Sequence, residues 1–269
     1  MDPVKGSIGV AAGAVIVGGT AFGVYSSMDP MPECDVLSGM NNFSDNNDYQ
    51  SGKYGFAYGD YLVDPDKLSE PKNKDWWEWS FRLLGKQDKT KIKKQFAGVS
   101  KAFDSTDTKA LNQICKNAYK ANKTDVTDNA QDTETNKYLE ADVWKFCSIS
   151  SNGTKPILLN KSGNTEDQKL VGTSADNSNK WGKKKEDVLV STRVESNNWF
   201  WELKEKQFRS ASSVVTNETN NIFKALKENS NGTVKATCQR AYDMDSSSSA
   251  TSVKEADLKA YCYLEKSSS

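Results

Sequence analysis

The sequence predicts a mostly α-helical protein in which an N-terminal transmembrane helix precedes two tandem small helical-bundle units, each with one disulfide. Three observations predict it: a long uncharged apolar run at the start, short motifs that recur in order, and apolar residues at helical spacing in both copies. We divide the chain into an anchor at 1–28, a juxtamembrane stalk at 29–53, repeat unit 1 at 54–149, a linker at 150–180 and repeat unit 2 at 181–269.

The anchor is predicted from residues 6–27, which carry no charged side chain. At a rise of about 1.5 Å per residue the run reaches about 33 Å, enough to cross a hydrocarbon core of about 30 Å. A cleaved signal segment is the alternative. Lys5 before the run and acidic residues such as Asp29 after it favour a single-pass protein of the cell membrane with its C-terminal bulk outside. Glycines four residues apart, as at Gly9 and Gly13, offer a face for self-association in the bilayer.

The internal repeat is carried by short motifs that keep their order at offsets between 115 and 127 residues. Each match is weak by itself, but the ordered set indicates a duplication. The matched pairs are Tyr54-Gly55 with Trp181-Gly182, Asp60-Tyr-Leu-Val63 with Asp187-Val-Leu-Val190, Trp77-x-Trp79 with Trp199-x-Trp201, Cys115-Lys-Asn-Ala-Tyr119 with Cys238-Gln-Arg-Ala-Tyr242, and Glu140-Ala-Asp142 with Glu255-Ala-Asp257.

Apolar residues spaced by three and four predict three to four helices in each unit. Residues 60–63 leave a short β contribution open, and Ser252 with Glu255 has capping-box spacing before the last helix. The helical faces are Trp77, Phe81 and Leu84; Ile92, Phe96, Val99 and Phe103; Leu111, Ile114, Cys115, Ala118 and Tyr119; Trp199, Leu203 and Phe208; Ile222 and Leu226; and Val234, Cys238, Ala241 and Tyr242.

Two of the five cysteines lie in each unit, and the simplest pairing is Cys115–Cys147 and Cys238–Cys262. Each closed loop is worth about 3.5 kcal/mol in the chain-entropy model, a large contribution for a small unit. Such bridges agree with an extracytoplasmic location, whereas four buried thiols in a cytosolic protein are the alternative. Cys34 lies outside both pairs and could join two chains into a homodimer, pair elsewhere or stay a thiol.

Composition excludes several kinds of chemistry. The chain has no histidine, which removes the usual proton shuttle and the commonest metal ligand. Lysine plus arginine and aspartate plus glutamate both number 36, so no excess positive charge favours nucleic acid. No C-x-x-C motif occurs, and the acidic loop of Asp125, Asp128, Asp132 and Glu134 lacks calcium-loop spacing. We predict no metal, no cofactor, no catalytic residue and no enzyme activity.

Two repeated motifs are the remaining candidates for a site. Trp77 and Trp79, with Trp199 and Trp201, would form an aromatic platform for carbohydrate or peptide if exposed, but we expect core anchors. The carboxylates of each Glu-x-Asp motif point about 200° apart on a helix and do not converge on one substrate atom. We expect them on the solvated first turn of a helix.

These motifs together resemble the large families of paralogous uncharacterised proteins of haemotropic mycoplasmas. The resemblance spans nearly the whole chain, although each motif is short. The residues that carry it are the run from Gly9 to Gly23, Cys115-Lys-Asn-Ala-Tyr119, Trp144-Lys-Phe146-Cys147, Cys238-Gln-Arg-Ala-Tyr242 and Tyr261-Cys262. Phe146 and Tyr261 depart from a family pattern that often has tryptophan before the final cysteine. The resemblance implies a surface-displayed protein of a wall-less bacterium, serving antigenic variation or host-cell contact.

The expected function is therefore that of a membrane-anchored, surface-exposed, non-enzymatic protein. Its expected partners are the lipid bilayer and a host-cell surface or antibody. The alternative is an extracytoplasmic carbohydrate- or peptide-binding or hydrolytic module that uses the tryptophans and nearby carboxylates. A third hypothesis is an assembly protein that oligomerises through Cys34 and the glycine faces.

Overall fold

The computed structural model describes residues 28–66, 71–131, 134, 136–229, 231–247 and 253–266. The predicted anchor and its glycine faces lie outside these residues. No helix in the described part of the chain is both long and apolar enough to cross a membrane. The transmembrane segment therefore stays a prediction from the sequence.

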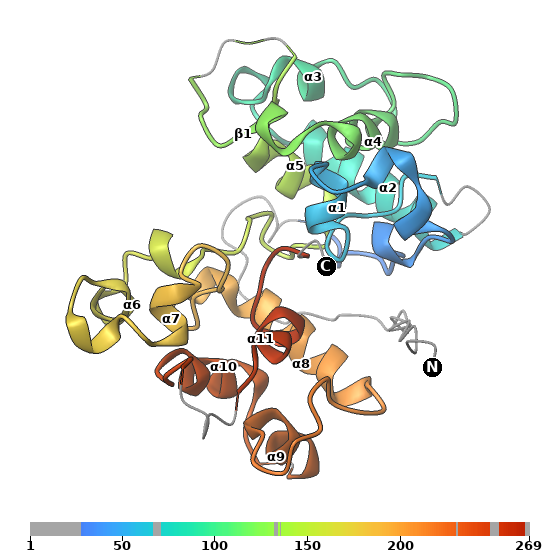
Figure 1. Ribbon diagram of the computed structural model, residues 1–269. Coiled ribbons are helices and arrows are strands. Elements are labelled where there is room, and N and C mark those ends of the chain that lie inside the picture. The colour runs from blue at the N-terminus through green and yellow to red at the C-terminus, as the bar shows by residue number, and fades with distance from the viewer. Residues whose placement is uncertain are drawn as a thin grey trace. The chain divides into compact units, whose positions relative to one another are not determined.

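The chain forms two compact units whose boundary lies between Lys155 and Pro156. The first unit contains five α-helices among its described residues, and α4 packs against the other four (Figure 1). They are α1 (Tyr54–Tyr58), α2 (Pro71–Gly85), α3 (Lys94–Ala97), α4 (Leu111–Lys120) and α5 (Glu140–Cys147), with the two-residue parallel strands β1 (Val126–Thr127) and β2 (Tyr138–Leu139).

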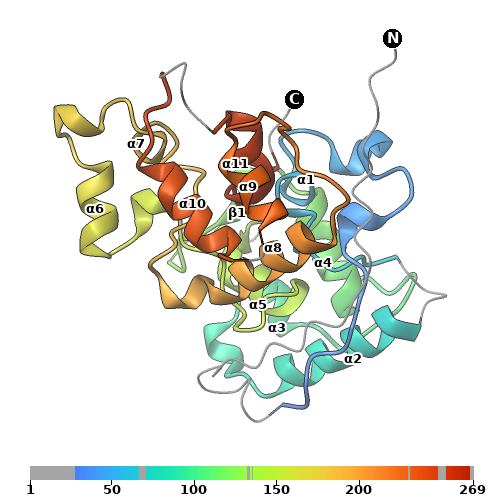
Figure 2. The ribbon, with the colours of Figure 1, turned by 90° about the horizontal axis from the view of Figure 1, so that it is seen from below.

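The second unit repeats this plan around α10, which packs against α7, α8, α9 and α11. Figures 1 and 2 both show α10 between α7 on one side and α8 on the other. The described α-helices are α6 (Thr165–Val171), α7 (Trp181–Lys184), α8 (Asn198–Ser210), α9 (Ile222–Glu228), α10 (Val234–Tyr242) and α11 (Glu255–Tyr261). The mostly helical fold class is thus confirmed.

The repetition extends to backbone hydrogen bonds that join distant segments. In the first unit the segment after α1 pairs with the end of α5, and the start of α1 bonds to the end of α4. In the second unit the same bonds join the segment after α7 to the end of α11, and the start of α7 to the end of α10. The equivalent bonds are Val63 N to Cys147 O (3.0 Å) and Val190 N to Cys262 O (3.1 Å), then Tyr54 N to Ala121 O and Trp181 N to Met244 O (both 3.0 Å). Residues 60–63 therefore contribute isolated β-bridges, the alternative that the sequence left open.

The repeated glycine is explained by close helix packing. A Cβ atom added at Gly55 would lie 3.0 Å from the Cβ of Tyr119 on α4. The equivalent Gly182 would bring its Cβ within 2.6 Å of Leu170 and 3.0 Å of the Tyr242 carbonyl. Both positions need a residue without a side chain because another segment of the unit approaches the backbone there.

The stalk and the linker are not spacers, and this expectation was wrong. Leu37 N donates to Leu62 O (2.7 Å), and Leu159 N donates to Leu189 O (2.9 Å), so residues 35–39 and 157–161 are equivalent parts of the two units. Both leucine side chains are fully buried. The polar residues between Leu159 and the next motif form turns and α6 instead of a linker. Each repeat therefore begins about 20 residues earlier than the sequence motifs indicated.

Two asparagines show that the aromatic motifs of the two units align in a different register from the predicted one. Asn73 accepts from Asp35 N (2.8 Å) and donates to Asp64 O (3.0 Å). Asn197 occupies the same position in the second unit, where it accepts from Ile157 N (2.8 Å) and donates to Ser191 O (2.9 Å). The offset here is 124 residues instead of 122.

This register makes Trp77 equivalent to Trp201 and Trp76 equivalent to Phe200. Ring geometry agrees, because the centroids of each adjacent pair are 4.9 Å apart with planes at 86°. The match of the two Trp-x-Trp motifs was therefore shifted by two residues. Both motifs read Trp-x-Trp in the sequence, and this identity led to the wrong alignment.

Most predicted helices are confirmed, but the one expected over residues 92–103 is wrong. Only α3 forms there. Gly98 N still makes a helical hydrogen bond to Lys94 O, but Ser100 N donates to Lys109 O, outside the helix. The last helix begins at Glu255, where the Asp257 side chain accepts from Lys254 N (3.1 Å). Ser252, the predicted cap, lies outside the described residues.

Candidate functional site

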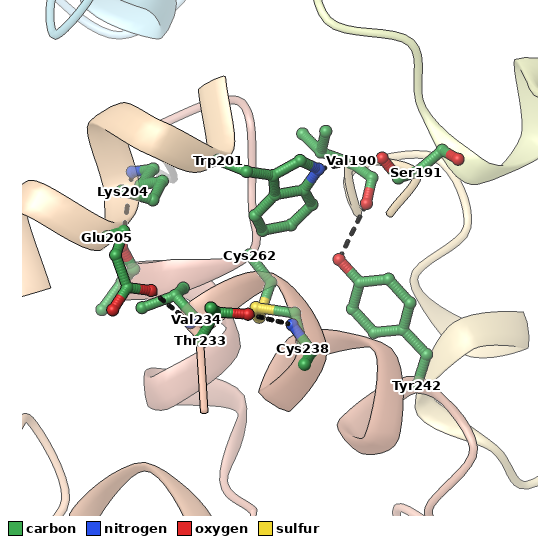
Figure 3. Close-up of a disulfide and its surroundings, with 12 residues drawn as sticks. Val190, Ser191, Trp201, Lys204, Glu205, Thr233, Val234, Cys238, Tyr242 and Cys262 are labelled. Atoms are coloured by element: carbon green, nitrogen blue, oxygen red, sulfur yellow. Dashed lines mark hydrogen bonds between the residues drawn. A yellow bond between two sulfur atoms is a disulfide. The ribbon is translucent and has the colours of Figure 1, made fainter. Parts of the chain in front are cut away.

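The cysteine pairing predicted from the spacing is confirmed in both units. Cys238 lies on α10 and bonds to Cys262 just after α11, with their Cα atoms 5.9 Å apart (Figure 3). Cys115 on α4 bonds to Cys147 at the end of α5, with Cα atoms 5.7 Å apart. All four are fully buried. Cys34 belongs to neither bridge and is half-buried.

A tyrosine four residues after the first cysteine of each pair adds a hydrogen bond beside the disulfide. Residues four apart share one face of a helix, so the disulfide and the tyrosine leave the central helix on the same side. Tyr119 donates from its hydroxyl to Cys147 O, and Tyr242 donates to Val190 O, each at 2.8 Å. Burial raises the pKa of both phenols well above its ordinary value. The Cys-x-x-Ala-Tyr motif is therefore a structural staple.

The four tryptophans of the candidate aromatic platform are buried, as expected for core anchors, so the platform alternative is wrong. Trp77 is 0% exposed, Trp79 and Trp201 3%, and Trp199 4%. The indole of Trp79 donates to Asp29 O (2.8 Å), and that of Trp201 donates to Ser191 O (3.1 Å). Both rings thus fix the preceding chain from inside the unit and offer no face to a carbohydrate or peptide.

The aspartate of each repeated Glu-x-Asp motif is also buried, against our expectation of a solvated turn. Asp142 accepts from Lys93 N (2.8 Å) at the start of α3, and Asp257 accepts from Asn221 Nδ2 (2.7 Å) at the start of α9. Each carboxylate therefore ties the last helix to the helix that precedes the central one. This role explains why the motif recurs in both units.

The glutamates of these motifs face other partners. Glu140 pairs with Lys155 (2.8 Å) and Glu255 with Lys185 (2.9 Å). The hydroxyl of Tyr54 also donates to Glu140 (3.0 Å). Because the two acids of a motif bind different segments, they do not form a two-carboxylate centre.

Substituting Asp142 by asparagine should change how stability depends on pH. Burial raises the pKa of the Asp142 carboxyl, and the hydrogen bond from Lys93 N only partly opposes this. A pKa that is higher in the folded than in the unfolded state contributes stability at low pH that is lost as pH rises through the folded value. We expect the stability of Asp142→Asn relative to the unmodified protein to increase from pH about 4 upwards.

Urea titrations between pH about 3 and 7 measure this difference. Asp107→Asn is the matched control, because the hydrogen bond from Lys109 N lowers the pKa of Asp107. Its effect has the opposite sign, since a lowered pKa contributes stability that is lost on acidification. Identical pH profiles for the two variants would contradict the burial of Asp142.

The second unit also contains a polar cavity of about 230 Å³ bordered by α6, α10 and the segment after Val190. Asp167 on α6 is 2% exposed, accepts from the Ser191 hydroxyl and lies 3.5 Å from Nε of Arg193. Gln239 and Tyr242 of α10 line the opposite wall. The cavity thus unites three segments that are distant in the sequence.

Sequence reasoning missed this cavity because Asp167 falls inside the predicted linker. The available signal was the shared leucine at 37 and 159, which would have extended the repeat to residue 35. No group of three metal-ligating side chains occurs among the described residues, where most of the acidic loop at 125–134 lies. Neither a family model, nor a curated protein, nor a solved structure matches the chain.

Proposed function

We propose that the protein is a membrane-anchored, surface-exposed, non-enzymatic protein that presents two disulfide-linked helical units to a host cell or to antibodies. The observation that carries the proposal is the presence of an equivalent disulfide in each unit. Structural disulfides form and persist on the oxidising side of a membrane and are rare in the cytosol. The uncharged run at residues 6–27 supplies the anchor.

The alternative of a carbohydrate- or peptide-binding or hydrolytic module using the tryptophans lacks support, because all four rings are buried. In both units the tryptophans and the aspartates of the acidic motifs take part in internal packing. The polar loops are therefore the surface that remains for contact. Exposed loops tolerate sequence change without loss of the core, which suits a variable antigen.

The test is chemical labelling of intact cells followed by peptide mapping. A membrane-impermeant amine reagent should modify the exposed Lys109 in the first unit and Lys184 in the second without lysis. Lys5 should react only after lysis, because the proposed orientation places it in the cytoplasm. A cytosolic protein of the same cells is the control and should stay unlabelled.

Mapping without reduction should also recover the peptides of Cys115 and Cys147, and of Cys238 and Cys262, as linked pairs. Labelling of Lys109 and Lys184 only after lysis, or alkylation of all these cysteines before reduction, would refute the proposal. Recovery of a peptide that ends near Ser27 would instead indicate a secreted protein with a cleaved signal segment.

A further inference from the structure

Residues that line the cavity of the second unit have equivalents in the first. Tyr242 and Arg193, which line it, correspond to Tyr119 and Asp66. In the first unit Tyr49, 1% exposed, ends a short helical turn (Asn47–Tyr49) that packs against α4, the helix that carries Tyr119.

The charges around the cavity are balanced. Three cations and three anions line it in pairs, which are Lys169 with Glu166 (2.8 Å), Lys180 with Asp243 (3.4 Å) and Arg193 with Asp167 (3.5 Å). A wall with both signs and no excess charge suits a ligand that itself carries both signs better than it suits a phosphate or a polyamine.

Arg193 is the one cation of this set whose partner is buried. Asp167 holds its Nε, and the Arg193 backbone N–H donates to the Ser191 hydroxyl (3.1 Å). The Arg193 side chain is one-third exposed, and its contact with Asp167 runs through Nε. A guanidinium that meets one carboxylate through Nε has two terminal nitrogens, which form a two-donor fork for a second carboxylate.

We propose that the second unit binds a small zwitterion of the α-amino acid class, with the ligand carboxylate on the terminal nitrogens of Arg193. The ammonium group would face the exposed carboxylates of Glu166 and Asp243, which border the same cavity. The volume of about 230 Å³ lies below that of pockets for drug-sized ligands, which limits the ligand to a free amino acid or a dipeptide. This inference does not depend on where the cell places the protein.

Calorimetric titration of the full-length chain in detergent tests the proposal. The probes are each of the common amino acids, glycylglycine, sodium acetate and methylammonium chloride. We expect saturable binding of at least one amino acid or of glycylglycine, and none of acetate or methylammonium at the same concentration. Binding of glycylglycine without any amino acid would assign the site to a peptide, and the reverse would assign it to a free metabolite.

Three variants, of which Arg240→Tyr is the control, locate the site. Gln239→Tyr places a ring in the cavity without altering its charges and should abolish binding. Arg240→Tyr changes the exposed neighbour on the same helix and should leave binding unchanged. Arg193→Lys keeps a positive charge beside Asp167 but loses the fork, and should weaken binding by about tenfold or more. Circular dichroism checks that each variant is folded.

Absence of binding for every zwitterion at millimolar concentration would overturn the proposal. Binding that survives in folded Gln239→Tyr would also overturn it, since the ligand would then lie elsewhere. Acetate that competes as well as an amino acid would refute the zwitterion class.

Discussion

Replacing Trp77 by alanine should destabilise the first unit by about 3–5 kcal/mol, the cost typical of removing a fully buried aromatic side chain. Trp77 is 0% exposed and packs edge to face against Trp76. Its equivalent, Trp201, packs in the same way against Phe200, so Trp201→Ala should destabilise the second unit by a similar amount. Urea unfolding followed by far-UV circular dichroism measures both effects.

Two further variants control for this result. Trp77→Phe retains a large apolar ring and should cost less than the alanine variant. Val215→Ala truncates a side chain that is 51% exposed and should change the free energy of unfolding by less than about 0.5 kcal/mol. If Trp77→Ala were as stable as Val215→Ala, the indole would not be part of the core, and the aromatic platform would return as a hypothesis.

Removing either disulfide should cost about 3.5 kcal/mol. The bridges close loops of 32 and 24 residues, and the chain-entropy model gives nearly equal stabilisation for these lengths. The double variants Cys115→Ala/Cys147→Ala and Cys238→Ala/Cys262→Ala avoid leaving a reactive thiol. Each should lower the stability of its own unit, measured by chemical denaturation without reductant.

Cys34→Ala is the matched control, since Cys34 belongs to neither bridge. It should leave the denaturation midpoint close to that of the unmodified chain. A loss in the double variants no larger than that of Cys34→Ala would mean that the bridges do not stabilise the folded units. A non-reducing gel of the same samples tests whether Cys34 joins two chains.

The sequence by itself determined the features that are encoded locally or by repeated spacing. The central helices α4 and α10 follow from apolar residues every three or four positions, because a helix places such residues on one face. The disulfides follow from one cysteine on that helix and one at the end of the last helix. Balanced charge and the absence of histidine were likewise readable without a structure.

The tertiary structure decided whatever depends on contacts between distant segments. Residues 35–39 and 157–161 share few side-chain identities and are equivalent because they make the same backbone hydrogen bonds, which almost any residue can form. The register of Trp77 with Trp201 is fixed by Asn73 and Asn197, which accept from Asp35 N and Ile157 N, 38 and 40 residues away in the chain.

The burial of polar residues was the other property that only the fold could assign. Asp142 and Asp257 are polar residues in the first turn of a helix, a position that is usually solvated. They are buried because α3 and α9 begin beside them with groups that donate to their carboxylates. The cavity beside Arg193 likewise exists because α6, α10 and the Val190 segment meet there. Local sequence sets which residues form helices, whereas the packing of those helices sets which polar groups are enclosed and which space stays open.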